Sequence, residues 1–404
     1  MDFNLPGEDD PRRIKVRKWF EENPNPTYAQ LAKQGWTASN WPEPWGVGAD
    51  AEMQWIIDEE IVRAGLELPY TINAIALNQC GQSLLNYGTE AQRQKFLPGA
   101  LACEEIWCML FSEPSGGSDL GALRTTARRE GDHYVVNGHK IWTSVADHAS
   151  VGVLVARTDA SKPKHSGLSM FLIDMKSPGV TVNPIIDMTG NKNEYNEVFL
   201  DNVKVPADAL LGQEGEGWKL TMEQLQTERV GMTKPGVVWG MGPTARDLMN
   251  GLIETGRIRD PLLRDEAAKL YIEGEILRLL TYRNMTSRIN GTPAGFEGSA
   301  GKMLSSPHGQ RMADLAKRSQ GVSGMIRNPD VLPLPEKKWG MFSNWDYAYW
   351  FSPANTLGVG TQEVLLNVVA ERVLGLPRES DPTAKVPFSE ISNTSAKAAK
   401  QVRQ

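Results

Sequence analysis

This chain of 404 residues has little cysteine, no long apolar run and no large excess of either charge. Its three cysteines, Cys80, Cys103 and Cys108, are too few for a disulfide framework, and none has the paired spacing of a metal site. No hydrophobic run approaches the length of a membrane span, and no N-terminal targeting signal is apparent. We therefore expect a cytoplasmic protein that holds no metal and does not enter a membrane.

The charge balance excludes a further class of partner. Lysine and arginine number 43 and aspartate and glutamate 49, which gives a formal net charge of −6. Such a chain has no basic surplus for nucleic acid or for an anionic membrane surface. A hydrophobic content of 40% and a charged content of 23% are ordinary for a soluble globular protein, and the length suggests two or three domains.

The residue pattern changes along the chain and predicts an α+β fold. Residues 1–105 show helical spacing, strongest at 50–64, 68–87 and 91–101, and predict an N-terminal helical domain. Short alternating runs between turns then predict a middle β-domain, barrel-like or sandwich-like, over residues 106–217. Residues 218–376 predict a C-terminal four-helix bundle, with helices at 218–232, 262–285, 301–320 and after Thr361. Residues 377–404 predict a polar tail.

One stretch combines a strand with a polar, glycine-containing turn. The apolar run 106–111 has strand length and stops at Ser112-Glu113-Pro114, because Pro114 cannot donate a hydrogen bond to a sheet. Residues 115–119 then place two glycines and two hydroxyls on a turn. A backbone without Cβ atoms can approach a ligand closely, and hydroxyls can bind it. The alternative is a strand that merely ends in a polar turn.

A second stretch follows about thirty residues later. Residues 134–144 predict two strand-like arms around an Asn137-Gly138 hairpin turn, and the second arm ends in Trp142, Thr143 and Ser144.

Together these two stretches resemble a known family. The order Ser-Glu-Pro-x-x-Gly-Ser-Asp, then Asn-Gly-x-Lys-x-Trp-x-Ser, is similar to the flavin-binding middle domain of acyl-CoA dehydrogenases, and the resemblance extends over residues 15–376. It implies the α–β–α fold of that family, non-covalent FAD, and conversion of an acyl-CoA thioester to the trans-2-enoyl-CoA. It also implies an electron-transferring flavoprotein as partner and a homodimer or homotetramer.

The resemblance also implies how the flavin is held. Ser112 and nearby backbone would bind the pyrimidine side of the ring, Trp142 would cover one face, and Ser144 would lie near N5. Ser118 would lie near the phosphates of substrate and cofactor. These roles suit a planar, amphipathic ring, which needs an aromatic wall and fixed polar groups at its edge. The further cofactor contacts implied are Phe111, Gly117, Thr361 and Glu363.

Such a reaction needs a carboxylate base within reach of the α-proton, desolvated enough to raise its pKa. The family supplies this glutamate from one of two positions. At the C-terminal position this chain has Val359, which cannot accept a proton. At the other, on the first bundle helix, Glu228 precedes Arg229, as in the isovaleryl-type and long-chain enzymes. We therefore predict that Glu228 is the catalytic base, the alternative being an exposed surface glutamate.

Helical periodicity adds to this prediction. Trp218, Met222, Leu225 and Arg229 are expected on one stripe of the helix, with Glu228 at its edge. Arg229 needs an anionic or carbonyl partner, either in the substrate or in a carboxylate such as Glu223 or Glu363. The other predicted substrate contacts are Ser118, Gln226 and the backbone N–H of Val359, which would bind the thioester oxygen.

The chain departs from the family pattern after the long helices. The family's Gln-x-x-Gly-Gly-x-Gly segment, which reaches the FAD of a neighbouring subunit, is replaced by residues 320–325, and a long insertion follows at 328–350. This divergence resembles actinobacterial enzymes for steroid side chains and other bulky acyl-CoAs, some of which are heteromeric. Two alternatives remain: an acyl-CoA oxidase or flavin monooxygenase of the same fold, or a non-catalytic subunit of a heteromeric enzyme.

Overall fold

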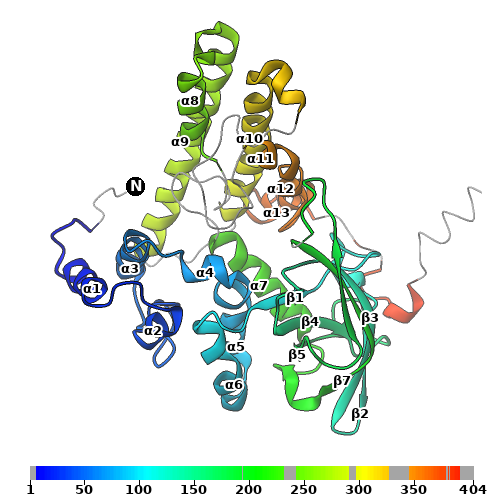
Figure 1. Cartoon of the computed structure of the whole chain (residues 1–404). Coiled ribbons are helices and arrows are strands. Elements are labelled where there is room, and N and C mark those ends of the chain that lie inside the picture. The colour runs from blue at the N-terminus through cyan, green and yellow to red at the C-terminus, as the bar shows by residue number, and fades with distance from the viewer. Residues whose placement is uncertain are drawn as a thin grey trace, which may run out of the picture.

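The computed structural model describes residues 6–192, 194–231, 243–290, 297–326, 345–378, 381 and 383–391, without the side chains of 226–231, 285, 288, 289, 297 and 298. Helices come first, a mixed sheet lies in the middle, and helices follow again, which confirms the predicted α+β class (Figure 1). Among the described residues, no helix combines the length and apolarity that crossing a bilayer requires.

The regular elements of the N-terminal region are all helical. Its elements are α1 (Pro11–Glu22), α2 (Tyr28–Lys33), α3 (Ala51–Arg63), α4 (Pro69–Ile72), a π-helical turn (Ile75–Cys80), α5 (Gly81–Tyr87) and α6 (Glu90–Leu101). The predicted helix at 50–64 is confirmed, and the Asp50 carboxylate caps α3 by accepting from the Met53 N–H at 2.8 Å. The predicted helix at 68–87 is instead divided into α4, the π-turn and α5.

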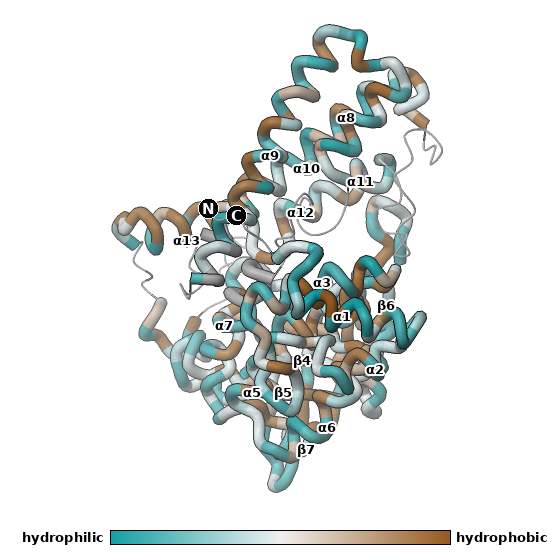
Figure 2. The backbone as a smooth tube through the Cα atoms, turned by 90° about the vertical axis from the view of Figure 1, so that its left-hand side faces the viewer, coloured by the Kyte–Doolittle hydropathy of each residue, from teal (hydrophilic) through white to brown (hydrophobic). Residues whose placement is uncertain are grey.

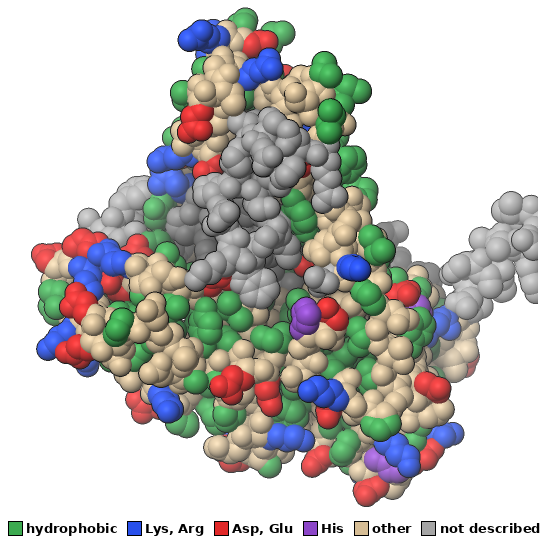
Figure 3. All heavy atoms as spheres, viewed as in Figure 1, with side chains coloured by type: hydrophobic (Ala, Val, Ile, Leu, Met, Phe, Trp, Pro, Cys, Tyr) green, Lys and Arg blue, Asp and Glu red, His purple; other side chains and the backbone are tan. Residues whose placement is uncertain are grey.

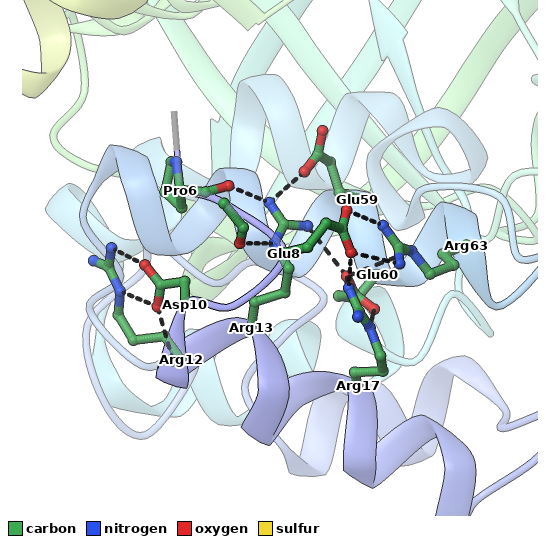
Figure 4. Close-up of polar contacts among 10 residues, drawn as sticks. Pro6, Glu8, Asp10, Arg12, Arg13, Arg17, Glu59, Glu60 and Arg63 are labelled. Atoms are coloured by element: carbon green, nitrogen blue, oxygen red, sulfur yellow. Dashed lines mark hydrogen bonds and ion pairs between the residues drawn. The ribbon is translucent and has the colours of Figure 1, made fainter. Parts of the chain in front are cut away.

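A cluster of charged side chains joins α1 to α3, drawn in Figure 4. The buried Arg13 donates to Glu60 at 3.1 Å, to Glu59 at 2.6 Å, and to the carbonyls of Pro6 and Gly7. Burial alone would raise the pKa of Glu60, but hydrogen bonds from Arg17 and Arg13 hold it below its usual value. We call Glu8, Arg13, Arg17, Glu59, Glu60 and Arg63 the Arg13 cluster.

The middle region forms one eight-stranded sheet, in the order β6-β7-β3-β2-β4-β5-β8, with β1 parallel to β4. Alternate residues of β4 pack on opposite faces: Val153 joins the core shared with the N-terminal helices, and Leu154 joins a second core against Phe171. The strands are β1 (Trp107–Leu110), β2 (Thr126–Glu130), β3 (His133–Ser144), β4 (Val151–Arg157), β5 (Leu168–Asp174), β6 (Val180–Ile185), β7 (Tyr195–Pro206) and β8 (Leu210–Leu211).

The predicted Asn137-Gly138 hairpin turn is wrong. Both residues lie inside β3, which pairs with β2 on one side and with β7 on the other, with an irregularity in the β7 register at this point. The glycine serves a close approach instead, because a Cβ at Gly138 would lie 2.1 Å from the Thr125 hydroxyl oxygen. A turn signal read locally cannot reveal this, since Thr125 lies on another segment.

The C-terminal region is helical, and α8 to α10 rise away from the rest of the molecule (Figures 1 and 2). The predicted bundle helices are present, and α8, which the sequence did not predict, packs on α9 around Leu248 and Leu252. The helices are α7 (Gly217–Gly231), α8 (Ala245–Glu254), α9 (Pro261–Ile289), α10 (Glu297–Ser319), α11 (Trp345–Phe351), α12 (Ala354–Leu357) and α13 (Gln362–Arg372).

The inward face of α7 differs from the predicted stripe. Leu220, Thr221 and Gln224 are buried, whereas Met222 is exposed. Leu220 joins the core shared by the N-terminal helices and the sheet, and the Gln224 amide lies 3.3 Å from the sulfur of Met170 on β5. Position 228 follows Gln224 by one helical turn.

Part of the segment expected to be a tail packs against the β-domain. The backbone N–H groups of Phe388 and Ser389 donate to the carbonyls of Lys162 and Ala160, both at 2.9 Å. The Phe388 ring lies over the buried Arg157 guanidinium, 3.4 Å from the ring centroid. These contacts tie residues 388 and 389 to the sheet.

Candidate active site

The two stretches singled out in the sequence meet in the structure. Lys140 on β3 donates from Nζ to the carbonyl of Phe111 at 3.0 Å and to the carboxylate of Glu113 at 2.9 Å. The N–H of Ile141 donates to the carbonyl of Ser112 at 3.0 Å. The turn after β1 is therefore fastened to β3 immediately before Trp142.

Lys140 and its partners form a buried ionic group at this junction. The third acceptor of Lys140 is the carbonyl of Val155 at 2.9 Å, so three acceptors meet the three protons of the ammonium. We call Lys140, the Glu113 carboxylate and the carbonyls of Phe111 and Val155 the Lys140 cluster.

Burial and the partner's charge shift the pKa of each member of this ion pair in opposite directions. Burial lowers the pKa of Lys140 to about 8, although the charge of Glu113 acts in the opposite direction. Burial alone would raise the pKa of Glu113, but the charge of Lys140 and hydrogen bonds from Thr125 and Arg124 hold it below its usual value. The sequence analysis assigned no role to Lys140 or Glu113, although both residues lie within the two motifs that carry the family resemblance.

The backbone beyond Lys140 adopts an unusual conformation. Trp142 and Val145 have φ values of 60° and 55°, in the left-handed region that non-glycine residues rarely occupy. The β3–β7 register shifts between Lys140 and Thr143. Such conformations cost about 1–3 kcal/mol each and are concentrated at functional sites. Both residues flank the predicted flavin-edge position Ser144.

The side chain of Trp142 faces outward. It is 57% exposed, and its ring meets Tyr195 edge to face, with centroids 5.9 Å apart. Ser112 is half-buried, and within the described part of the chain no group hydrogen-bonds to its hydroxyl. An exposed aromatic face with hydroxyls nearby fits a planar amphipathic ring such as a flavin.

The remaining β-domain predictions divide into buried and exposed residues. Phe111 packs its ring in the core, and its carbonyl accepts a hydrogen bond from Lys140. Gly117 and Ser118 are exposed on the turn, and a Cβ at Gly117 would meet no atom within 4 Å.

The Ser144 hydroxyl donates to Glu194 at 3.2 Å, a residue that no sequence motif indicated. Burial raises the pKa of Glu194, and the nearby Asp187 and Asp147 add to this effect against the Ser144 hydrogen bond. A carboxyl group therefore lies beside the predicted flavin edge. It reaches this position because β7 pairs with the end of β3.

On the helical side, the segment between α12 and α13 is also left-handed. Val359 and Gly360 have φ values of 58° and 87°, and the conformation is an outlier for a β-branched residue. Thr361 caps α13 by accepting from the Val364 N–H at 3.2 Å, and Glu363 is exposed in the first turn of that helix. None of the described residues accepts a hydrogen bond from the Val359 N–H.

Aromatic contacts connect the two sides. Phe351 of α11 stacks on Tyr195 with centroids 6.4 Å apart, and Tyr195 is the residue that meets Trp142. The Asn191 amide bonds the Tyr347 hydroxyl at 3.4 Å. The helix that leads toward Val359 is thus packed against the strand beside Trp142.

Three predicted residues lie partly outside the described structure. The backbone of Gln226, Glu228 and Arg229 belongs to α7, but their side chains are not among those described. Their assignment as base and substrate contacts stays a prediction. Most of the insertion at 328–350 is also outside the described residues, which resume at Trp345.

Sequence comparison assigns this chain to a class of flavin-dependent enzymes. The family models for the N-terminal, middle and C-terminal domains of acyl-CoA dehydrogenases match residues 10–104, 108–203 and 215–374. The chain therefore belongs to the acyl-CoA dehydrogenase family and is a flavin-dependent oxidoreductase.

Individual relatives agree with this family. Acyl-CoA dehydrogenase IpdE1 of Mycobacterium tuberculosis is 34% identical over 358 residues, which cover 87% of this chain and 87% of that protein. Acyl-CoA dehydrogenase FadE34 of the same organism is 34% identical over 348 residues, which cover 86% of this chain. The same match covers 46% of FadE34, so this chain spans about half the length of that relative.

Two solved structures have the same fold. One, a "Tcur3481-Tcur3483 steroid ACAD", matches with a TM-score of 0.74 at 27% identity and covers 94% of this chain and 100% of its own. The other, the ChsE4-ChsE5 complex from Mycobacterium tuberculosis, matches with a TM-score of 0.73 at 26% identity over 94% of this chain and 100% of its own.

Proposed function

We propose that the protein dehydrogenates an acyl-CoA thioester to the trans-2-enoyl-CoA, with FAD as its flavin and Glu228 as the base. The observation that carries this proposal is the outward Trp142 ring, with Ser144 beyond it and Ser112 fastened to β3 immediately before it. Ser112, Trp142 and Ser144 would hold the flavin ring, and Phe111 and Gly117 would contribute backbone. Bound FAD supplies the acceptor for the hydride that leaves the β-carbon.

The chain's own residues would prepare the substrate for this transfer. The Val359 N–H, which lacks an acceptor among the described residues, would donate to the thioester oxygen and stabilise the charge that develops there. Glu228 would take the α-proton, and Gln226, Arg229 and Ser118 would position the thioester. The buried face of α7 supports the placement of Glu228, because its position continues the row of Thr221 and Gln224.

The substrate class that we propose is a bulky acyl-CoA of the steroid side-chain kind, with fatty acyl-CoA as the alternative. The similarity to a steroid ACAD structure at 27% identity supports this choice. An electron-transferring flavoprotein would reoxidise the FAD.

We further propose that the protein works as an oligomer, either a homodimer or homotetramer or a heteromer. Apolar side chains are exposed on the C-terminal helices, including Ile272 and Ile276 on α9, Leu304 on α10 and Leu366 on α13. On the face shown in Figure 3, hydrophobic side chains are interspersed with acidic and basic ones. The similarity to the ChsE4-ChsE5 complex supports the heteromer.

The reaction is tested by mixing the purified protein anaerobically with straight-chain, branched and steroid-side-chain acyl-CoA thioesters. Loss of the oxidised flavin absorbance with at least one of them is expected, followed by reoxidation with an electron-transferring flavoprotein. Rapid turnover with oxygen alone would indicate an oxidase or monooxygenase. A protein that stays colourless after FAD is added would indicate a non-catalytic subunit.

Assembly is tested by counting flavins per subunit in the chain expressed alone. A value below one that rises when a partner chain is supplied would support the heteromer. One flavin per subunit in a stable homo-oligomer would exclude it.

A further inference from the structure

Lys302 of α10 is a buried cation bonded to the segment that carries Val359. It is 5% exposed, and its Nζ donates to the carbonyl oxygens of both Gly358 and Gly360, the latter at 2.6 Å. The residue after Lys302 makes a second contact, because the carbonyl of Met303 accepts a hydrogen bond from the Gln362 amide at 3.2 Å. The left-handed segment is therefore held from α10 on both sides of Val359.

The two carbonyls that Lys302 binds have a direct relation to the Val359 N–H. The carbonyl of Gly358 and the N–H of Val359 belong to one peptide unit, which is trans. In a trans peptide these two groups point in opposite directions in one plane. A cation on the carbonyl oxygen therefore directs the N–H away from Lys302, and the Gly360 contact fixes the next peptide plane.

The same contact changes the strength of the donor. Hydrogen bonds in series polarise one another, and a charged donor on the oxygen withdraws electron density from the peptide nitrogen. The Val359 N–H thereby becomes a better donor than an ordinary backbone amide. Its lack of an acceptor among the described residues leaves it available for a ligand.

We propose that Lys302 is a positioning residue for the reaction: it orients and polarises the Val359 N–H so that this group binds the thioester oxygen. The inference rests on the proposed function, which assigns that N–H to the thioester. Lys302 itself does not touch the substrate, and it acts through the Gly358–Val359 peptide unit. Its ammonium would also help a β-branched residue to hold a conformation that normally favours glycine.

The test uses Lys302→Met in the flavin-loaded protein, with Lys317→Met as the matched control. Lys317 lies on the same helix, is largely buried and pairs with Asp346 at 2.6 Å, so its loss also removes a buried cation from α10. The probe is a trans-2-enoyl-CoA that carries ¹³C at the thioester carbonyl, made from the acyl-CoA that reduces the wild-type flavin fastest. The infrared stretch of this carbonyl in the complex reports how strongly the oxygen is bound.

In the wild type and in Lys317→Met the carbonyl stretch should move to lower frequency than in solution. In Lys302→Met most of this shift should disappear, and flavin reduction should slow by about 10- to 100-fold, less than the 10²–10³ for losing an oxyanion donor outright. Lys302→Arg, which keeps a cation with donors, should recover part of both. Should Lys302→Met fail to bind flavin, Lys302→Gln, which stays polar but loses the cation that polarises the peptide unit, replaces it with the same readouts.

An unchanged carbonyl shift in a flavin-loaded Lys302→Met or Lys302→Gln protein would overturn the proposal. Equal losses in the Lys302 and Lys317 variants would overturn it too, because they would indicate a general effect on α10. A wild-type flavin that no acyl-CoA in the panel reduces would instead contradict the proposed function.

Discussion

Two buried ionic clusters in this protein use similar chemistry for different purposes. In the Arg13 cluster and in the Lys140 cluster alike, a buried cation binds one buried carboxylate and two backbone carbonyls. The Arg13 cluster joins α1 to α3, and Glu60 is shared among Arg13, Arg17 and Arg63. The Lys140 cluster has one cation and fastens the turn that carries Ser112 beside Trp142.

The difference lies in redundancy and in what is held. Arg13 keeps Glu59 and two carbonyls if Glu60 is lost, whereas Lys140 alone among the described residues forms a salt bridge with Glu113. A cluster that attaches one helix to another tolerates the loss of a member. A cluster that shapes the turn that we propose binds the flavin should transmit the loss to that site. The following variants test this contrast, beginning with the largest expected effect.

Lys140→Met should be the most damaging change. It leaves the Glu113 carboxylate buried without its cation, which typically costs about 3–5 kcal/mol in the free energy of unfolding. The turn at 111–113 also loses its anchor, so bound flavin should be lost at the same time. Urea unfolding and the flavin content of the purified protein measure the two effects. Full flavin content in a folded variant would remove the link between this cluster and the site.

Trp142→Ala should separate binding from stability. The ring is mostly exposed in the ligand-free protein, so the free energy of unfolding without flavin should change by no more than about 0.5 kcal/mol. Flavin affinity should fall by about 3 kcal/mol if the ring is fully covered in the complex. Isothermal titration of the flavin-free protein with FAD gives this difference. Unchanged affinity would exclude Trp142 as the wall of the flavin site.

Glu60→Gln should affect stability and leave the site alone. Arg13 retains its other acceptors, so the expected loss is about 1–3 kcal/mol in the free energy of unfolding. Flavin content and the rate of flavin reduction should equal those of the wild type. A loss of flavin as large as that in Lys140→Met would erase the distinction between the two clusters.

The pH dependence of stability should show the smallest difference. The pKa values of Glu60 and Glu113 are lowered in the folded protein, so the unfolded chain binds more protons in acid. Their stabilisation is fully present above about pH 4.3, the ordinary glutamate pKa, and is lost as the pH falls through the folded values. In Glu60→Gln, the free energy of unfolding should therefore change less steeply with pH in this range than it does in the wild type. Urea titrations between about pH 2 and pH 5 measure this pH dependence. The same slope in Glu60→Gln and in the wild type would argue against a lowered pKa of Glu60.

The sequence predicted features that depend on local pattern and on motif. The α+β order, the helix at 50–64 and the family were accessible because periodicity and motif spacing are written in neighbouring residues. The hairpin at Asn137-Gly138 failed because the requirement for glycine comes from Thr125, on a neighbouring segment. The prediction of which α7 residues face inward was wrong because packing against β5 and the N-terminal helices determines that face.

Contacts across long separations could not be predicted for the same reason. Lys140 and Glu113 are 27 positions apart, and Lys302 is 56 positions from Gly358. No single sequence tells which carbonyl a lysine will meet after the chain folds. Glu194 is a similar case, since only the pairing of β7 with β3 brings it to Ser144.

The central claim, that this chain removes an α-proton with Glu228, is tested most directly by one measurement on Glu228→Gln. The substitution keeps the size and hydrogen-bonding capacity of the side chain but removes its ability to accept the proton. Flavin and acyl-CoA should still bind, and anaerobic single-turnover flavin reduction with the best acyl-CoA should slow by about 10²- to 10⁴-fold. Reduction at the wild-type rate would contradict the claim and place the base elsewhere.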